Sequence, residues 1–197
     1  MRNILVSCIC LFFFLILEET HAQTLVYKGY KGDDYIGDMI VKREVKGDQV
    51  FFHSEAILNV RFLLNWELRF YYEADFKGGD LKRSLVQLTR DGKLRTEVKG
   101  QREGSYYNSD VDGDKESLQI PNIDYCVLNT YFEAPKGRKK IFSERWGSWL
   151  TVEDQGNGRY ILQPPNGSHN TLIYKNGICQ EMQFNHTIAK VRFVLKE

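Results

Sequence analysis

The sequence is poor in several features that would narrow its function. Only four cysteines occur among 197 residues, and two of these lie within the first ten, so a disulfide-rich scaffold is excluded. The formal net charge is +1, which gives no long-range attraction to nucleic acids or strongly acidic partners. After residue 22 no apolar run reaches the roughly 20 residues that a spanning helix needs, so we expect no transmembrane segment in that part.

Signatures of catalysis and cofactor binding are also missing. The sequence contains no G-x-S-x-G elbow, no H-E-x-x-H pair and no glycine-rich phosphate loop ahead of a helix. Residues 110–116 carry alternating carboxylates, as a calcium loop does, but Lys115 replaces the sharp-turn glycine and Pro121 the final glutamate. Cysteine and histidine spacings do not suit zinc. We therefore predict no metal and no cofactor.

The N-terminus has the organisation of a secretory signal. A positive start at Arg2 precedes an uncharged apolar segment over residues 4–17, and a small-x-small pattern follows at residues 20–22. This predicts a signal peptide over residues 1–22 and an exported protein of the periplasm or the extracellular space. Residues 23–197 contain no linker or internal repeat, and we expect them to form a single β domain.

The clearest local pattern is an alternation in residues 66–77. Apolar and polar side chains take turns there, which is the period of a strand with one buried face. If the sheet curves into a barrel, the inward side chains line an interior that can hold a small apolar ligand. The candidate ligand-binding residues are Trp66, Leu68, Phe70, Tyr72 and Phe76. The competing interpretation is that these side chains simply fill a core.

Turn signals such as Asp91-Gly92 and Asn176-Gly177 recur roughly every ten residues. They predict strands within 24–120 and 148–195, and an all-β fold in which an antiparallel meander forms a curved sheet or incomplete β-barrel. Residues 62–64 lack a turn signal, and we interpret them as a bulge in one bent strand. One short helix is expected in residues 122–134, where apolar residues have helical spacing between two prolines and Asn122 can cap the start.

The two cysteines outside the signal segment, Cys126 and Cys179, leave two alternatives open. In an oxidising compartment they can form a disulfide. They can equally remain buried free thiols, which pack as small apolar side chains.

Several motifs carry a resemblance to a known family. They are Tyr35-Ile36-Gly37-Asp38-Met39, Phe142-Ser143-Glu144-Arg145-Trp146-Gly147, Tyr174-Lys175-Asn176-Gly177-Ile178-Cys179, Asn185-His186-Thr187 and the closing Val191-Arg192-Phe193-Val194-Leu195-Lys196. The sequence resembles an uncharacterised family of exported Gram-negative proteins, the domain of unknown function number sixty-one thirty-four. The resemblance covers nearly all of the mature chain and implies a curved antiparallel sheet or incomplete barrel. It brings no catalytic residues.

The leading hypothesis is a non-enzymatic protein of the Gram-negative envelope that binds an apolar small molecule or lipid. Two alternatives stay open. One is an envelope enzyme with an unrecognised site near Ser143, Glu144 and Arg145. The other is a structural or assembly partner that adds a strand at an open sheet edge. Nucleic acid is not expected as a partner, because the chain is predicted to be exported.

Overall fold

The computed structural model describes residues 21–61, 65–185 and 190–196. These residues form fourteen strands and one 3-10 helix. The elements are β1 (His21–Lys31), β2 (Asp34–Lys46), β3 (Gln49–Arg61), β4 (Asn65–Lys77), β5 (Asp80–Arg90), β6 (Lys93–Glu103), β7 (Tyr106–Val111), β8 (Asp114–Gln119), η1 (Val127–Tyr131), β9 (Lys140–Ser143), β10 (Ser148–Asp154), β11 (Arg159–Gln163), β12 (His169–Lys175), β13 (Ile178–Asn185) and β14 (Lys190–Leu195).

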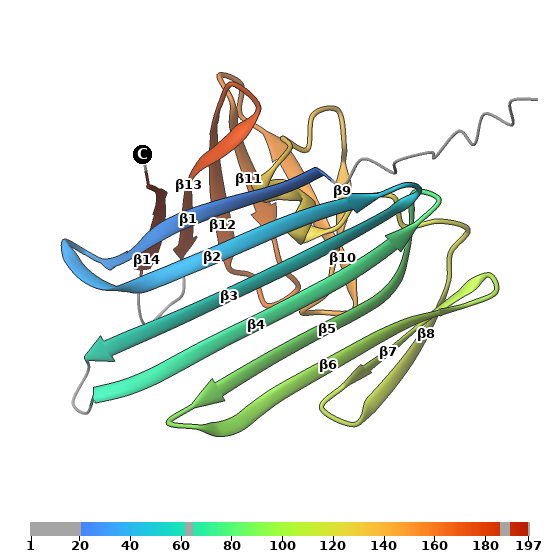
Figure 1. The fold of residues 1–197 in the computed structure, drawn as a ribbon, viewed down its shortest axis with the longest axis horizontal. Coiled ribbons are helices and arrows are strands. Elements are labelled where there is room, and N and C mark those ends of the chain that lie inside the picture. The colour runs from blue at the N-terminus through green and yellow to red at the C-terminus, as the bar shows by residue number, and fades with distance from the viewer. Residues whose placement is uncertain (1–20, 62–64, 186–189, 197) are drawn as a thin grey trace, which may run out of the picture.

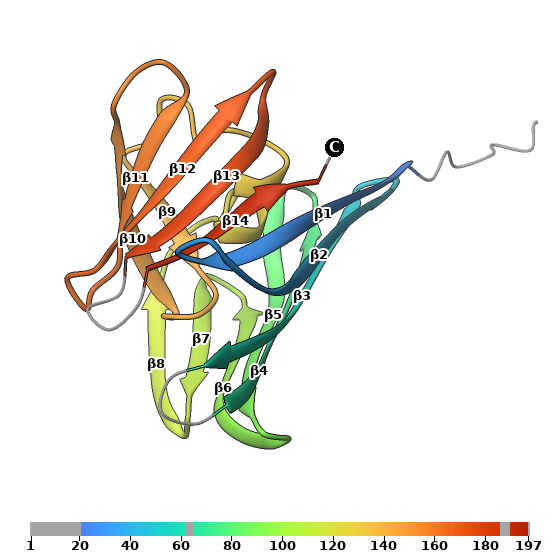
Figure 2. The same cartoon turned by 90° about the vertical axis from the view of Figure 1, so that its left-hand side faces the viewer.

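All fourteen strands belong to one sheet, in the order β8-β7-β6-β5-β4-β3-β2-β1-β14-β13-β12-β11-β10-β9. Every pairing is antiparallel, and β1 pairs with both β2 and β14, so the first and last strands meet in the middle of the sheet. The two halves curve away from this seam, and β8 and β9 are left as edges (Figures 1 and 2). The predicted all-β class, a curved antiparallel sheet or incomplete barrel, is confirmed.

Turn chemistry explains why the meander forms. At Asp91-Gly92, Asp112-Gly113 and Asn176-Gly177 both residues have positive φ, as a two-residue type I′ hairpin turn requires. Glycine is also required inside β2. At Gly37 φ is +146°, and a Cβ atom there would lie 2.0 Å from the carbonyl oxygen of Ile57. The close approach of β2 to β3 at this point is therefore open only to glycine.

The short helix expected in residues 122–134 is present before β9, but it occupies only part of that segment. Only Val127–Tyr131 are helical, as a 3-10 helix, and the N-cap is Cys126 rather than Asn122. The preceding backbone is bound elsewhere, because Leu81 N–H donates to the Ile123 carbonyl at 2.9 Å and Phe142 N–H to that of Tyr125 at 3.2 Å. These bonds to β5 and β9 hold the segment extended, so tertiary contacts override the helical pattern. The bulge predicted at residues 62–64 lies outside the described residues.

The two ends of the sheet meet by side-chain packing. Phe142 of β9 packs edge-on against Tyr107 of β7 at 5.1 Å and against Trp149 of β10 at 5.7 Å. Gly147, in the turn between β9 and β10, brings the chain so close to β7 that a Cβ would lie 2.7 Å from the Cβ of Ser109. Aromatic and glycine contacts, without strand pairing, therefore bring β9 and the turn after it against β7.

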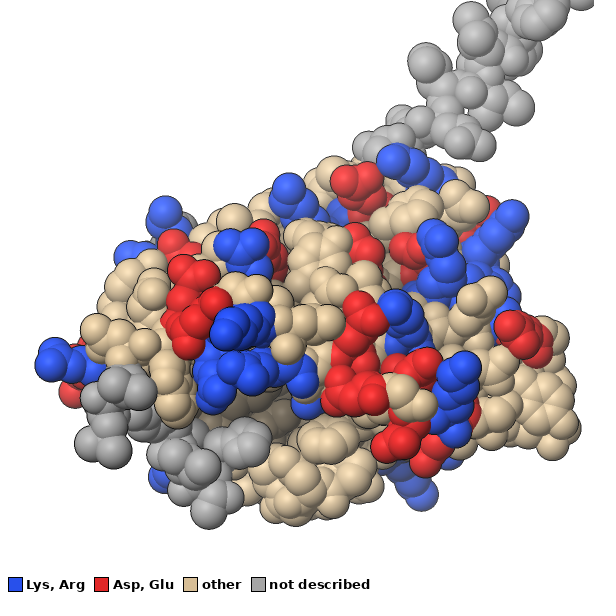
Figure 3. All heavy atoms as spheres, turned by 90° about the horizontal axis from the view of Figure 1, so that it is seen from below, with Lys and Arg blue, Asp and Glu red and all other residues tan. Residues whose placement is uncertain are grey.

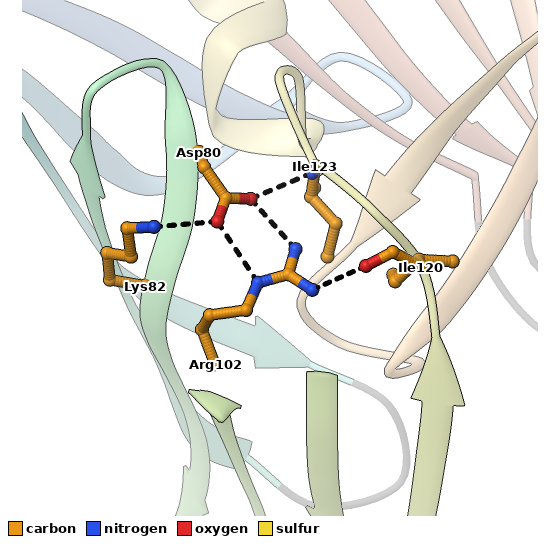
Figure 4. Close-up of polar contacts among 5 residues, drawn as sticks. All are labelled: Asp80, Lys82, Arg102, Ile120 and Ile123. Atoms are coloured by element: carbon orange, nitrogen blue, oxygen red, sulfur yellow. Dashed lines mark hydrogen bonds and ion pairs between the residues drawn. The ribbon is translucent and has the colours of Figure 1, made fainter. Parts of the chain in front are cut away.

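One end of the barrel, which we call the plugged end, is filled by η1 and the segment before it. η1 contacts β3, β9 and β13, so it lies inside the curve of the sheet (Figure 2). At the same end Asp80 binds Arg102 through both carboxylate oxygens, at 2.8 and 3.1 Å, and accepts from Ile123 N–H and Lys82 (Figure 4). Arg102 also donates to the Ile120 carbonyl at 2.8 Å. This buried network fixes the plug to β5 and β6.

Candidate ligand-binding interior

The inward face of β4 changes character along its length. Ala74 and Phe76, near the plugged end, are 0% and 5% exposed. Further along, the inward side chains are only half-buried, although cross-strand partners such as Leu58 are buried. These half-buried side chains are Trp66, Leu68, Phe70 and Tyr72. Inward apolar side chains keep accessible surface only where the interior is not filled, so the core is packed at the plugged end and hollow toward the other.

The hollow opens at what we call the open end, where β3, β5 and β7 finish and β4, β6 and β8 begin. The view from below, on the side away from η1 in Figure 1, shows the surface hollowed beside a group of Lys and Arg side chains (Figure 3). Half-buried Phe184 and Val191 pack on the same core from the other half of the sheet. Apolar side chains from both halves thus face one space.

Of the five residues predicted from the alternation, the structure places four together on the wall of this hollow. They are Trp66, Leu68, Phe70 and Tyr72. The fifth, Phe76, belongs to the packed end, where its ring meets that of Phe52 edge-on at 5.8 Å.

The turn between β9 and β10 supplies polar groups to the interior. Glu144 is 1% exposed, and its two carboxylate oxygens accept from the backbone N–H groups of Val127 and Leu128 at 3.1 and 3.0 Å. Burial raises the pKa of Glu144 above its ordinary value. Its carboxyl group therefore faces η1 and satisfies the first N–H groups of that helix.

Arg145, the next residue, has a different environment. It is half-buried, with its guanidinium 5.4 Å from the Trp146 ring. The pKa of the Tyr72 hydroxyl is raised to about 12 overall. Burial is the largest cause and raises it, the positive charge of Arg145 lowers it, and Glu144 raises it. Tyr72 is thus deep enough in the protein to be desolvated and still keeps accessible surface, as expected for a group on the wall of an internal hollow.

Sequence reasoning missed Arg90. This side chain follows the inward register of β5, opposite Leu68, and its guanidinium lies 4.9 Å from the Trp66 ring. In the sequence Arg90 adjoins the Asp91-Gly92 turn and resembles an ordinary solvated charge. The signal that could have found it is the alternation of Val86, Leu88 and Arg90, which continues the inward face to the end of the strand.

Of the residues of the enzyme alternative, Ser143 ends β9, and Glu144 and Arg145 lie in the turn that follows, where Glu144 is bound to η1. His53 faces outward, where its ring meets Tyr71 and its Nδ1 lies 4.0 Å from Glu73. Among residues 21–61, 65–185 and 190–196, no three His, Cys, Asp or Glu side chains are grouped so that they could hold a metal ion.

Cys126 and Cys179 are both free and buried. The Cys126 thiol lies 3.2 Å from Asn129 Oδ1, and the Cys179 thiol lies 3.4 Å from the Glu181 carbonyl oxygen. Burial raises the pKa of Cys126 well above its ordinary value and that of Cys179 to about 12, which keeps both in the unreactive thiol form. A disulfide between them stays a prediction, and it requires both thiols to leave these acceptors.

The architecture defines a β-barrel-like protein with one plugged end. A solved structure with similar architecture is the β-barrel-like protein of domain of unknown function DUF1849 from Brucella abortus. It superposes with a TM-score of 0.59 at 11% identity, over 88% of this chain and 95% of the other. At that identity the likeness establishes the fold alone.

The sequence itself identifies the family. Residues 27–196 match the family described as a domain of unknown function, DUF6134, and the chain belongs to that family. No curated protein matches the chain. Within the part of the chain that the structure describes, no helix has the length and apolar character needed to cross a membrane.

Proposed function

We propose that this is a non-enzymatic, exported protein of the Gram-negative envelope that holds an apolar small molecule or lipid inside its incomplete barrel. The observation that carries the proposal is the half-buried inward face of β4 between Trp66 and Tyr72. Aromatic and aliphatic walls around a hollow with few polar groups are typical of small-molecule sites. Location in the envelope is proposed from the signal-like N-terminus, of which residues 1–20 lie outside the described residues.

The burial pattern favours a ligand over a core that is merely loosely packed. Protein interiors normally reach crystal-like density, and β4 does so at Ala74 and Phe76. Leaving four large side chains only partly buried on the inward face forfeits apolar burial worth about 25 cal/mol per Å². An apolar ligand that covers those surfaces recovers this free energy.

Titration with an environment-sensitive fatty-acid probe tests the proposal on the chain that begins at Gln23. We expect saturable binding in the micromolar range. Phe70→Ala removes part of the wall of the hollow and is expected to weaken binding roughly tenfold, since a phenyl ring contributes a large share of apolar contact. Tyr71→Ala is the matched control, because Tyr71 is the next residue on β4, faces outward and contacts His53. An absent saturable signal, or equal losses in both variants, would contradict the proposal.

An exposed edge strand and an apolar surface patch support the alternative that this is a structural or assembly partner. β8 is an edge strand whose six residues are all exposed except half-buried Leu118. Tyr35, Ile40 and Ile57 also form an apolar patch on the outer face, with 55%, 41% and 36% of their surfaces exposed, beside a depression of about 490 Å³. Edge strands and apolar patches of this kind serve protein partners. If the protein binds no probe in the titration, we would instead assign it a role in binding a protein partner, through the β8 edge or the apolar patch.

A further inference from the structure

Arg145 is the most unusual charged group in the hollow, because the folded protein does not neutralise it. In the described part of the chain no carboxylate forms an ion pair with its guanidinium, which lies 5.4 Å from the centre of the Trp146 ring. The adjacent carboxylate, Glu144, is bound to η1 by both oxygens. A half-buried guanidinium loses part of its hydration, and an anion that binds beside it recovers the lost free energy.

Tyr72 offers a second donor at the same place. Within the described residues its hydroxyl makes no hydrogen bond, although the charge of Arg145 acts on it. A phenol that stays protonated at neutral pH donates to an oxygen acceptor. Arg145 and Tyr72 together therefore present a cation and a neutral donor to one position inside the hollow.

Apolar side chains lead from Tyr72 and Arg145 toward the open end. From Tyr72 the inward face of β4 continues through Phe70 and Leu68 to Trp66, a distance of roughly 20 Å at the rise of an extended strand. Arg90 lies over Trp66 at the open end and likewise forms no ion pair with a described residue. The wall thus runs from a deep cationic position, along apolar side chains, to a second cation near the opening.

We propose that the ligand is a single-chain amphiphile with an anionic head, a carboxylate or a phosphate monoester, which binds Arg145 and the Tyr72 hydroxyl. Its apolar chain lies along Phe70 and Leu68 toward the open end. Arg90 attracts the head at the entrance. This inference rests on the proposed function, and it adds the chemical class of the ligand and its orientation.

Calorimetric titration with four molecules that share one alkyl chain tests it: laurate, dodecyl phosphate, dodecanol and dodecylamine. At neutral pH we expect the better of the two anions to bind at least roughly tenfold more tightly than dodecanol, and dodecylamine to bind most weakly. The order of laurate and dodecyl phosphate distinguishes a fatty acid from a phosphorylated lipid. Arg145→Gln should abolish the preference for the anion and leave the dodecanol affinity unchanged.

Two further variants keep the test decisive. Arg69→Gln removes the same charge from the outer face of β4, where Arg69 lies 3.7 Å from Glu55, and should leave all four affinities unchanged. Tyr72→Phe removes only a hydroxyl and should weaken anion binding roughly threefold, which tests the site even if Arg145→Gln folds poorly. Equal affinities for anions and dodecanol would overturn this inference while the proposed function stands. If none of the four binds, both fail.

Discussion

Arg102→Met is expected to lower the free energy of unfolding by about 3–5 kcal/mol, the cost of breaking one side of a buried ion pair. Arg102 and Asp80 are only 6% and 14% exposed. The substitution removes both bonds to Asp80 and the donor of the Ile120 carbonyl (Figure 4). Chemical denaturation followed by fluorescence measures the change.

The matched control is the exposed pair on neighbouring strands. Arg83 and Asp75 lie 2.5 Å apart, but Arg83 is 71% exposed, and such pairs contribute at most about 1 kcal/mol. Arg83→Met should therefore have little effect. If both substitutions cost the same, the plug is not held by the Asp80 network.

The same pair predicts a pH dependence. Desolvation raises the pKa of Asp80, but the bonds from Ile123, Lys82 and Arg102 outweigh it, so the net pKa lies below the ordinary carboxyl value. A carboxylate with a lowered pKa contributes stability above its unfolded-state pKa and loses it as the pH falls through the folded-state pKa. The stability difference between wild type and Arg102→Met should therefore narrow in acid.

Glu144→Ala is expected to lower the free energy of unfolding by about 2–4 kcal/mol, because it leaves two backbone N–H groups at the start of η1 without their carboxyl acceptor. Glu144→Gln should fall between Ala and wild type, since the amide keeps one acceptor oxygen and its NH₂ group faces the second N–H. Thermal and denaturant unfolding measure both. Glu153→Ala, at an exposed position on β10, is the control and should be near neutral. A Glu144→Ala protein as stable as this control would show that the plug does not depend on Glu144.

The sequence predicted the strands, and which of their side chains point inward, wherever one face of a strand is buried and the other is exposed to solvent. Residues 66–77 alternate because β4 has that environment, and the turn pairs with positive φ were predicted from their asparagine, aspartate and glycine. β9 was missed because Ile141, Phe142 and Ser143 are all buried. Successive side chains of a strand point to opposite faces, and Ile141 and Phe142 are both 0% exposed, so both faces of β9 are covered and no period of two remains.

The candidate site was predictable as a set of residues but not as an arrangement. The alternation identified the wall of the hollow, yet only the fold separates half-buried Phe70 from Phe76 in the packed end. Glu144 and Arg145 were singled out as part of the candidate enzyme site. Their separate roles depend on η1, which binds Glu144 but not Arg145. The two hydrogen bonds join residues sixteen and seventeen positions apart, and such a contact leaves no signal in the local sequence.

Native mass spectrometry of the protein, purified from the cells that make it, shows whether the interior holds a ligand. We expect a chain that begins at Gln23 and carries the additional mass of one acidic, single-chain amphiphile. The additional mass should be lost on denaturation and should be much reduced in Arg145→Gln. A wild-type protein that is recovered only as the bare chain, under conditions in which a known lipid carrier keeps its ligand, would contradict the account.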